Sequence, residues 1–323
     1  MMSKRADEAG EKPSPKVSVC VVTYNQERYI KECLQSLVEQ TVDFPIEIIV
    51  ADDCSTDGTS DIVRTYAGQY PEIIHVRRSR NVGALRNYLE VHAAARGDYV
   101  AHMDGDDYAL PGKLQTQAAA LDRDPRCTAV WHRMDFFDDK GGFCSGRTAD
   151  ISSFPDGRVE FGDGARLGFI GMHSSLMYRR SAREATVDFD RAALDMRMML
   201  ELLSTGHGLV LDTVLGRYRV ASSGSMLASS SGLVHRLALE HACEFMARYP
   251  EHRRDFMIWA LSGAVIAAKN RQAWALDYLR FAWRARSWVG PGRVLANLLR
   301  IRRTRMKWRS QRGVFKPKTA LET

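Results

Sequence analysis

The chain has 323 residues, of which 45% are apolar and 26% charged, as is typical of a soluble globular protein. This length suits one large α/β domain with an appendage. The six cysteines show neither the paired spacing of zinc ligands nor a dense disulfide framework, so we expect reduced thiols in a cytosolic protein. The longest apolar stretch, residues 256–268, is too short to cross a bilayer.

Positive charge is concentrated at the carboxyl-terminal end. The net charge is +7, and residues 280–323 hold 13 lysines and arginines against the single acid Glu322. The rest of the chain therefore carries a small net negative charge. This asymmetry predicts contact between the basic tail and an anionic surface.

The chain begins with a polar segment, residues 1–15, which lacks the apolar core of a signal peptide and is predicted to be a disordered leader. Residues 16–22 are almost all apolar and rich in valine, which favours a strand buried on both faces of a parallel sheet. That strand ends at Thr23-Tyr24-Asn25. Apolar residues at helical spacing then predict a helix over residues 29–37.

Strand, turn and helix continue to alternate through the first part of the chain. Further strands are predicted over residues 46–51, 73–77 and 99–103. The polar run 52–59 follows the first of these, and Asp57 or Ser55 is expected to cap the next helix, with Asp52 a further candidate for that role. This alternation predicts an open, mostly parallel α/β sheet flanked by helices, which binds ligands at the carboxyl ends of its strands.

The later part of the chain has a different pattern. Loop-rich sequence is expected over 138–163, and a Ser- and Gly-rich linker or mobile loop over 222–232. Elements are predicted as strands over 128–134, 175–178 and 210–220 and as helices over 114–121, 195–203, 233–249, 256–268, 271–286 and 293–309. We therefore expect a domain over 16–222, with a nucleotide-binding half (16–115) and an acceptor half (116–222), and a helical carboxyl-terminal region with a basic tail over 223–323.

The strand over 99–103 ends in three carboxylates within four positions, namely Asp104, Asp106 and Asp107. Like charges packed so closely repel one another, and burying even one is costly without a neutralising partner. Oxygen ligands at such a place suit Mg²⁺ or Mn²⁺ better than zinc. A hard cation held there is a clamp for a diphosphate.

The order of these motifs resembles family 2 glycosyltransferases, which have the A-type glycosyltransferase fold. The resemblance covers residues 16 to about 220. It is carried by Val22-Thr23-Tyr24-Asn25, the run 52–59, Asn81-Val82-Gly83 with Arg86-Asn87, the acidic run 104–107 with Pro111, Lys113 and Leu114, and the acidic helix start at Asp195.

The resemblance implies a role for each matching position. Thr23 and Tyr24 belong to the nucleotide site, where Tyr24 stacks on the base. Asp53 accepts a hydrogen bond from the imide N–H of uracil or thymine, Arg86 lies near the base or diphosphate, and Asp104 contacts the ribose or orders the metal shell. Asp106 is the metal ligand and Asp195 the catalytic base, while His173 and Ser174 lie where the family lines its acceptor pocket.

Elementary chemistry agrees with these roles. A carboxylate only accepts hydrogen bonds, so Asp53 favours a base with an N–H at that edge and rejects cytosine. The metal neutralises the leaving diphosphate, so no protein acid is needed there. One base on the opposite side of the sugar implies a single in-line displacement, which inverts the anomeric centre.

Two positions depart from the family pattern. Val220 stands where a histidine often completes the metal shell, so His173 or water is left as the third ligand. The segment Asn81–Asn87 also lacks the usual full spacing between its glycine and its arginine.

Two other classes of protein compete with this interpretation. A nucleotidyltransferase or a dinucleotide-binding oxidoreductase would carry a glycine-rich phosphate loop after the first strand, and residues 23–27 contain no glycine. A non-catalytic protein on the same fold, binding nucleotide or nucleic acid, would use the basic tail and its tryptophans. It would not need both a metal ligand and a base, so we expect no nucleic acid as a partner.

We therefore expect an inverting, metal-dependent enzyme that moves a sugar from a UDP- or dTDP-sugar to a saccharide or lipid-linked acceptor in surface glycan synthesis. Mn²⁺ or Mg²⁺ would be its cofactor, and the cytoplasm its location. The basic segment 287–323 predicts reversible attachment to the anionic inner face of the membrane, with Trp308 suited to the headgroup layer.

Overall fold

A computed structural model describes residues 14–139, 142–144, 154–185, 195–220, 231–285, 287–312 and 316–317. The predicted leader up to residue 13 and most of the predicted Ser/Gly-rich linker, residues 221–230, lie outside the described residues. Within the described residues, no helix is both long and apolar enough to span a bilayer.

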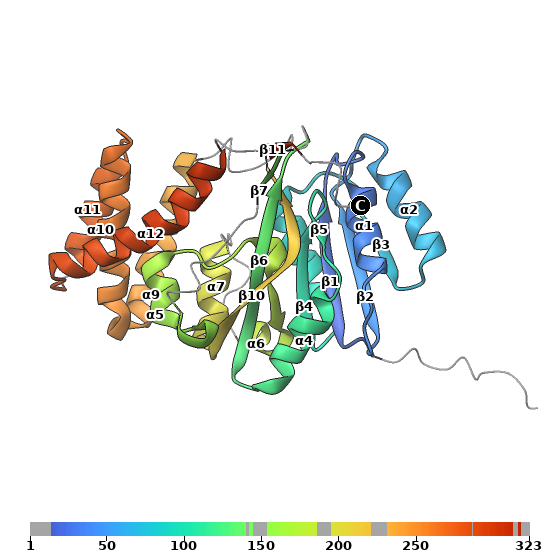
Figure 1. Ribbon diagram of the computed structural model, residues 1–323, viewed down its shortest axis with the longest axis horizontal. Helices are drawn as coiled ribbons and strands as arrows, with labels where there is room; N and C mark the ends of the chain where they lie inside the picture. Colours follow the sequence, from blue (N-terminus) through green and yellow to red (C-terminus); the bar gives the residue numbers. More distant parts are fainter. Residues whose placement is uncertain are drawn as a thin grey trace, which may run out of the picture.

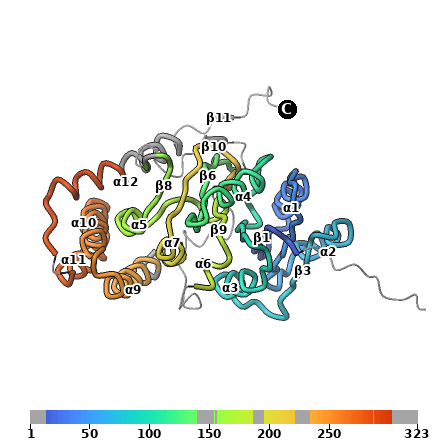
Figure 2. Tube along the Cα trace, turned by 90° about the horizontal axis from the view of Figure 1, so that it is seen from below, coloured from blue at the N-terminus to red at the C-terminus, as the bar shows by residue number. Residues whose placement is uncertain are grey.

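A sheet of eleven strands forms the centre of the molecule, and helices cover both of its faces (Figures 1 and 2). Its amino-terminal strands are β1 (Val17–Thr23), β2 (Ile46–Asp52), β3 (Ile73–Arg77), β4 (Tyr99–Asp104) and β5 (Tyr108–Ala109). The later strands are β6 (Cys127–Phe137), β7 (Gly142–Cys144), β8 (Arg158–Val159), β9 (Met177–Arg179), β10 (His207–Arg219) and β11 (Lys316–Pro317).

The helices alternate with the strands and then follow them as a group. The first half has α1 (Ile30–Val38), α2 (Thr59–Gln69), α3 (Ala84–Ala94) and α4 (Lys113–Arg123). Short helices α5 (Phe161–Leu167), α6 (Arg180–Glu184) and α7 (Asp195–Ser204) follow. The carboxyl-terminal group is α9 (Ser231–Arg248), α10 (Arg253–Lys269), α11 (Ala275–Arg284) and α12 (Pro291–Arg312).

The central strands are parallel, as predicted. β1 pairs with β2 and β4, and β2 pairs with β3, all in parallel. Beyond β4 the sheet becomes mixed, because β9 runs antiparallel between β4 and β6, while β10 returns parallel to β6. Parallel pairing places the carboxyl ends of β1, β2 and β4 at one edge of the sheet.

Alternate residues of each central strand enter two different cores. In β1, Val17, Val19 and Val21 pack with α1, α2 and α4, whereas Cys20 faces α3 and the later helices. Because both faces are covered, these strands are mostly apolar, with Ser18, Glu47 and His102 as buried exceptions, and this pattern is the signal that predicted them.

The carboxyl-terminal helices share a core with the sheet. Phe256 and Trp259 of α10 belong to the same buried cluster as Trp131 of β6 and Tyr178 of β9. The helical region predicted over 223–323 is therefore packed directly against the part of the molecule that carries the site.

Candidate functional site

Polar residues converge where the parallel strands end. Thr23 ends β1 and Tyr24 follows it, Asp53 follows β2, and Asp104 and Asp106 lie at the end of β4 and in the turn after it. The register pairs Thr23 with Asp52 and Val22 with Asp104, so these ends are neighbours in space. The fold thus brings the predicted nucleotide and metal residues to one edge.

Asp53 is held by backbone amides. Its two carboxylate oxygens accept hydrogen bonds from Val82 N at 2.8 Å and Gly83 N at 2.9 Å, and the residue is only 2% exposed. Gly83 has φ of +88°, a conformation that favours glycine, and it precedes the first turn of α3. Each carboxylate oxygen has a second lone pair, so acceptance of a base N–H by Asp53 stays a prediction.

The prediction that Asp52 caps α2 is wrong. Its Oδ1 accepts a hydrogen bond from Ser55 N at 2.9 Å, which closes a turn ahead of the helix instead. Asp57, the other expected cap, does support the helix start, since its Oδ1 accepts from Thr59 N at 3.0 Å and from Thr59 Oγ1 at 2.6 Å. The difference arises because Asp52 is still paired in β2 when the chain turns.

Tyr24 and Arg86 are the accessible members of the predicted nucleotide site. Tyr24 is 44% exposed, so it is not packed as a core residue at the end of its strand. The Arg86 side chain is 64% exposed, and its Nε lies 2.7 Å from Glu90 Oε1 one turn further along α3. Thr23 is buried and donates through Oγ1 to Gln26 Oε1 at 2.8 Å. Tyr24 and Arg86 therefore have the exposure that ligand contact requires.

The acidic run 104–107, called the acidic turn below, is fixed to the segment that carries His173 and Ser174, the predicted acceptor-pocket residues. Asp104 N donates to Ser174 Oγ at 3.0 Å, and Ser174 Oγ donates to Asp104 Oδ2 at 3.3 Å. Ser174 is fully buried in the short 3-10 helix η3 (His173–Ser175). Burial raises the pKa of Asp104, while His173 and the Ser174 hydroxyl act against the rise.

Asp107, the last residue of the acidic run, is buried and bonded to the backbone of β10. It is 1% exposed, and its Oδ1 accepts from Arg219 N at 2.8 Å. Burial and the neighbouring carboxylates of Asp106 and Asp104 raise the pKa of Asp107 well above its usual value. Asp107 thus ties the turn to the end of β10.

Arg219, which sequence reasoning missed, braces this turn. Its Nε donates to the Asp106 carbonyl at 3.0 Å, and its two terminal nitrogens reach Asp139 at 2.7 Å and Glu32 at 2.8 Å. The guanidinium lies between the rings of Tyr29 and Phe137, with centroids at 4.3 and 4.2 Å. The only signal in the sequence was an arginine just before the position where a metal-binding histidine was expected.

Lys113 is a second buried cation near the turn. It is fully buried, and its Nζ donates to the Ser174 carbonyl at 3.0 Å. Burial lowers the pKa of Lys113 to about 8, while Cys33 and Asp107 act against the fall. A buried ammonium beside Asp107 offsets part of the negative charge that the acidic turn collects.

The donor set of this turn fits a hard divalent cation. Asp104 and Asp106 offer carboxylate oxygens, and Mg²⁺ is commonly held by one or two carboxylates plus substrate phosphates and water. Among the described residues, however, no group of three or more His, Cys, Asp or Glu side chains is arranged to hold a metal ion. His173, left open as a third ligand, lies instead against Asp195.

Three histidines, the buried His92 and His102 and the partly exposed His173, connect the acidic turn to the predicted acceptor side. His102 Nε2 is 3.1 Å from Asp104 Oδ1, and His102 Nδ1 is 3.0 Å from His92 Nε2. His92 Nδ1 is in turn 2.9 Å from the Tyr178 hydroxyl. The His102 and His173 rings lie 4.2 Å apart. Sequence reasoning missed His92 and His102, because they belong to α3 and β4 and meet only in the folded chain.

Burial keeps these imidazoles neutral at pH 7. It lowers the pKa of His102 to about 3 and that of His173 to about 4. Burial also lowers the pKa of His92 well below its usual value. Neutral rings can pack against one another without charge repulsion, and each offers one donor and one acceptor nitrogen.

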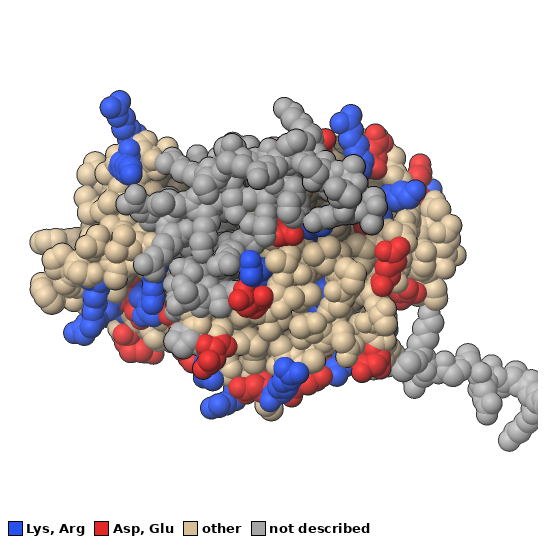
Figure 3. Space-filling view, viewed as in Figure 1, with Lys and Arg blue, Asp and Glu red and all other residues tan. Residues whose placement is uncertain are grey.

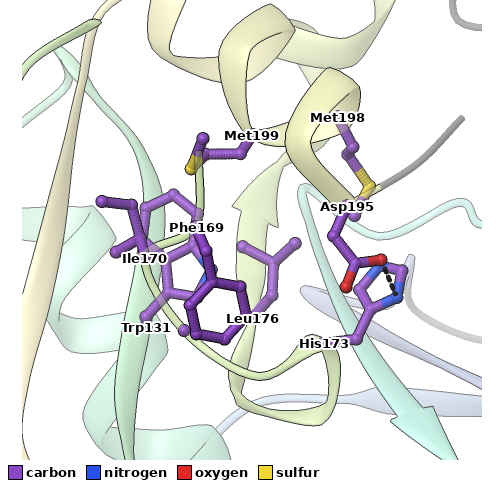
Figure 4. A pocket seen from close by; sticks show the side chains of 9 residues that line it. Trp131, Phe169, Ile170, His173, Leu176, Asp195, Met198 and Met199 are labelled. Atoms are coloured by element: carbon purple, nitrogen blue, oxygen red, sulfur yellow. Dashed lines mark ion pairs between the residues drawn. The ribbon is translucent and has the colours of Figure 1, made fainter. Parts of the chain in front are cut away.

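Asp195 begins α7 and faces His173 (Figure 4). Asp195 Oδ1 lies 3.3 Å from His173 Nδ1, and the Asp195 side chain is 59% exposed. Both residues line a small pocket that is partly open to solvent. The rest of its lining is mainly apolar and consists of Trp131, Phe169, Ile170, Gly171, Leu176, Met198 and Met199.

The candidate site therefore has two parts of different character. Carboxylates and an exposed tyrosine occupy the strand ends, while an accessible carboxylate borders an apolar pocket. The open sheet, its site at the strand ends and its helical extension define an A-type glycosyltransferase fold.

A family model described as glycosyl transferase family 2 matches residues 18–186, just over half of the chain. The chain belongs to this family.

Solved structures share the fold over most of its length. TarS residues 1–349 of Staphylococcus aureus, in complex with UDP-GlcNAc, superpose with a TM-score of 0.62 and 22% identity, covering 92% of this chain and 89% of that one. A mannosyltransferase of Pyrobaculum calidifontis in complex with GDP-Man and Mn²⁺ superposes with a TM-score of 0.57 and 19% identity, covering 93% and 84%.

Curated relatives match shorter segments. An uncharacterized protein of Mycobacterium tuberculosis is 43% identical over 118 residues, which are 36% of this chain and 34% of that protein. The putative glycosyltransferase EpsE of Bacillus subtilis is 37% identical over 130 residues, 39% of this chain and 46% of that one. The match thus spans less than half the length of these relatives.

Proposed function

We propose that this protein transfers a sugar from a UDP- or dTDP-sugar to a saccharide or lipid-linked acceptor in surface glycan synthesis, with inversion at the anomeric carbon. One observation carries the proposal: the acidic turn after β4 and the accessible Asp195 carboxylate lie on opposite ends of one chain of contacts. That chain runs from Asp104 through His102 and His173 to Asp195. This connection supports a donor clamp and a base that serve one reaction.

On the donor side, each role follows from the chemistry of the residue. The exposed ring of Tyr24 stacks on the base, and Asp53 accepts the base N–H while it holds the loop at residues 82–83. Arg86 serves the base or diphosphate, and Asp104 the ribose. Thr23 supports the turn between them through its bond to Gln26.

Asp106, with Asp104 in support, would hold Mn²⁺ or Mg²⁺ against the diphosphate. When bound, the cation neutralises the charge that the departing diphosphate gains. The mannosyltransferase of similar fold that was solved with Mn²⁺ supports the choice of metal.

On the acceptor side, Asp195 is the general base. It takes the proton of the acceptor hydroxyl as that oxygen bonds to the anomeric carbon, and the bond from this carbon to the diphosphate oxygen breaks on the opposite face. The electron pair of the broken bond leaves with the diphosphate. Because the entering and leaving oxygens occupy opposite faces, the configuration inverts.

His173 is placed to orient that base. It is neutral at pH 7, and its Nδ1 lies within donor reach of Asp195 Oδ1. Tyr88 and His102 pack on the His173 ring at 4.9 and 4.2 Å, which limits its rotation. A carboxylate that is exposed to solvent needs such a partner to keep one orientation.

The pocket beside Asp195 supports a saccharide acceptor. Phe169 is 38% exposed and offers apolar surface for the carbon face of a sugar, whereas Trp131 and the two methionines of the lining are buried. Ser174, which was predicted for this pocket, is fully buried and is not among its lining residues. Relatives named as poly(ribitol-phosphate) glycosyltransferases, 38–40% identical over short segments, favour a cell-surface polymer.

A donor screen tests this function. The protein with Mn²⁺ is incubated with UDP-, dTDP-, GDP- and CDP-sugars, and nucleoside diphosphate release is measured with and without candidate saccharides. We expect acceptor-dependent release from UDP- or dTDP-sugars and a product of inverted anomeric configuration by NMR. Release from GDP-sugars alone would contradict the role of Asp53, and retention of configuration would contradict single displacement.

We also propose a cytoplasmic protein that attaches reversibly to the inner face of the membrane. The support is the basic composition of residues 287–323, although side chains beyond residue 301 lie outside the described part of the chain. Such attachment would bring the enzyme to lipid-linked acceptors.

A further inference from the structure

Helix α11 is apolar on two opposite faces. Tyr278, Phe281 and Ala282 are buried, and the Trp259 ring of α10 packs on Tyr278 and Phe281 at 5.3 and 6.0 Å. On the other face, Leu276, Leu279 and Trp283 are 61%, 47% and 85% exposed. Their spacing of three and four residues places them in one stripe along the helix. The buried face attaches the helix to the core, whereas the face with Leu276, Leu279 and Trp283 remains exposed to solvent.

Exposed apolar side chains are concentrated in this region. Of the ten large hydrophobic residues that are exposed in the described part of the chain, six lie between residues 276 and 299. Besides the stripe on α11, they are Trp288 at 81%, Leu295 at 57% and Leu299 at 45%. Such a concentration marks an interaction surface, whereas isolated apolar residues elsewhere do not.

Helix α12 is packed with its residues Leu295 and Leu299 exposed to solvent. Asn297 is buried, and its Nδ2 donates to the Arg166 carbonyl at 3.1 Å and to Ser262 Oγ at 3.0 Å. These bonds attach α12 to α5 and α10. Leu295 and Leu299, on a different face of the helix, therefore stay exposed. Figure 1 places α11 and α12 at the end of the molecule opposite β2, β3 and α2.

Basic residues predominate in the segment that carries these side chains. Residues 269–300 contain seven lysines and arginines and one acid, Asp277. Asp277 Oδ1 lies 3.0 Å from Arg280 Nη1, so its charge is locally compensated. In Figure 3, Lys and Arg side chains project above and below the tan surface at this end of the molecule, and Asp and Glu side chains are also visible along its lower edge. The surface is thus complementary to a negatively charged partner.

We infer that the exposed stripe of α11, together with Trp288, docks this protein on an anionic lipid bilayer. Tryptophans suit the headgroup layer, leucines enter its acyl boundary, and arginines pair with lipid phosphates. This inference rests on the proposed function only for the location of the acceptor. It places the main apolar contact on α11 and not in the basic segment 287–323.

Vesicle sedimentation tests the docking surface. The full chain is mixed with phosphatidylcholine vesicles with and without 30% phosphatidylglycerol, at low and high salt, and compared with the double variant Leu279→Glu/Trp283→Glu. We expect salt-sensitive binding to anionic vesicles, and at least about tenfold weaker binding of the variant. Ile74→Glu is the matched control, because Ile74 is 39% exposed on β3 at the other end of the molecule. This variant should bind vesicles as the wild type does.

Equal binding of the double variant and the wild type would overturn the inference, as would a wild type that binds neither kind of vesicle. If light scattering shows a wild-type dimer that the double variant dissociates, with no vesicle binding, the stripe is instead an interface between copies. Brominated lipids give an independent readout, since they should quench tryptophan fluorescence less in Trp283→Phe than in the wild type.

The outcome is separable from that of the proposed function. Nucleotide binding and transfer to a water-soluble saccharide need no membrane, so they should be unchanged in the double variant. Failure of vesicle binding with normal transfer would reject the docking surface alone. Absence of transfer with normal vesicle binding would reject the proposed function alone.

Discussion

The proposed donor side and the proposed acceptor side of the site are built differently. On the donor side, Asp53 and Asp107 are buried and bonded to backbone amides, and Asp104 is fixed by Ser174 and His102. On the acceptor side, the Asp195 side chain is 59% exposed, and the contact described for it is the one with His173. The donor side is therefore rigid through local turns, while the acceptor base depends on one tertiary contact.

This difference suits the two ligands. A nucleoside diphosphate presents the same groups whatever sugar it carries, so a rigid set of carboxylates can recognise it. The acceptor meets an apolar pocket and one accessible carboxylate, which constrain its chemistry less. Substitutions on the two sides should therefore separate binding from turnover.

The largest effect is expected for Asp106→Ala. Removing the proposed cation ligand should lower transfer by roughly three orders of magnitude or more, because the diphosphate then leaves without a neutralising charge. Loss of wild-type activity in chelator and its return with Mn²⁺ or Mg²⁺ is the companion measurement. Asp61→Ala, at an exposed ion pair on α2, is the control. Full wild-type activity in chelator would remove the metal from the proposal.

Asp195→Asn should act on turnover alone. The amide keeps the shape of the side chain but cannot take a proton, so kcat should fall by about two to four orders of magnitude. Donor affinity, measured by calorimetry, should be close to that of the wild type. A variant that loses donor affinity instead would place Asp195 on the donor side of the comparison.

Asp53→Ala should show the reverse pattern. Loss of the charge-assisted hydrogen bond should weaken UDP binding by roughly 1–3 kcal/mol. Because Asp53 also holds the loop at residues 82–83, affinity for CDP is measured in parallel. The wild type should prefer UDP, and the variant should lose that preference. A variant that weakens both nucleotides equally would show that Asp53 acts only on the loop.

His173 sharpens the comparison on the acceptor side. His173→Ala should lower kcat roughly tenfold with little change in donor KM, since the base loses its orienting partner. His173→Asn keeps a donor nitrogen near the position of Nδ1 and should recover much of that loss. Equal defects in both variants would indicate that the ring acts through packing on His102 and Tyr88 instead.

The smallest expected effect concerns stability and pH. Burial lowers the pKa of His132 to about 3, below the value of about 6.5 expected when the chain is unfolded. The unfolded chain therefore takes up a proton between these values that the folded chain refuses, so stability falls as the pH falls through this window. The free energy of unfolding is measured by urea titration at pH 7 and pH 5. Between these two values it should fall less steeply in His132→Asn than in the wild type, by up to about 1.4 kcal/mol per pH unit. An unchanged slope would show that His132 does not contribute.

Much of the fold could be predicted from the sequence, for local reasons. β1, β2 and β4 are largely apolar runs that end in polar residues, and each is followed by a helical pattern, so their existence and the gathering of polar residues at their ends were predictable. The family was also predictable, because its motifs are short, contiguous and in order, and the match over residues 18–186 confirms it.

Only the tertiary structure decided how the site is supported. His92, His102 and His173 come from α3, β4 and η3, and their contacts depend on β9 running antiparallel beside β4, which no pattern in the sequence specified. Arg219 likewise reaches Asp106 and Glu32 across more than a hundred residues of chain. Periodicity and local motifs report on neighbours in sequence, whereas the partners of buried charges and the faces of helices left uncovered, such as the α11 stripe, depend on how distant elements pack.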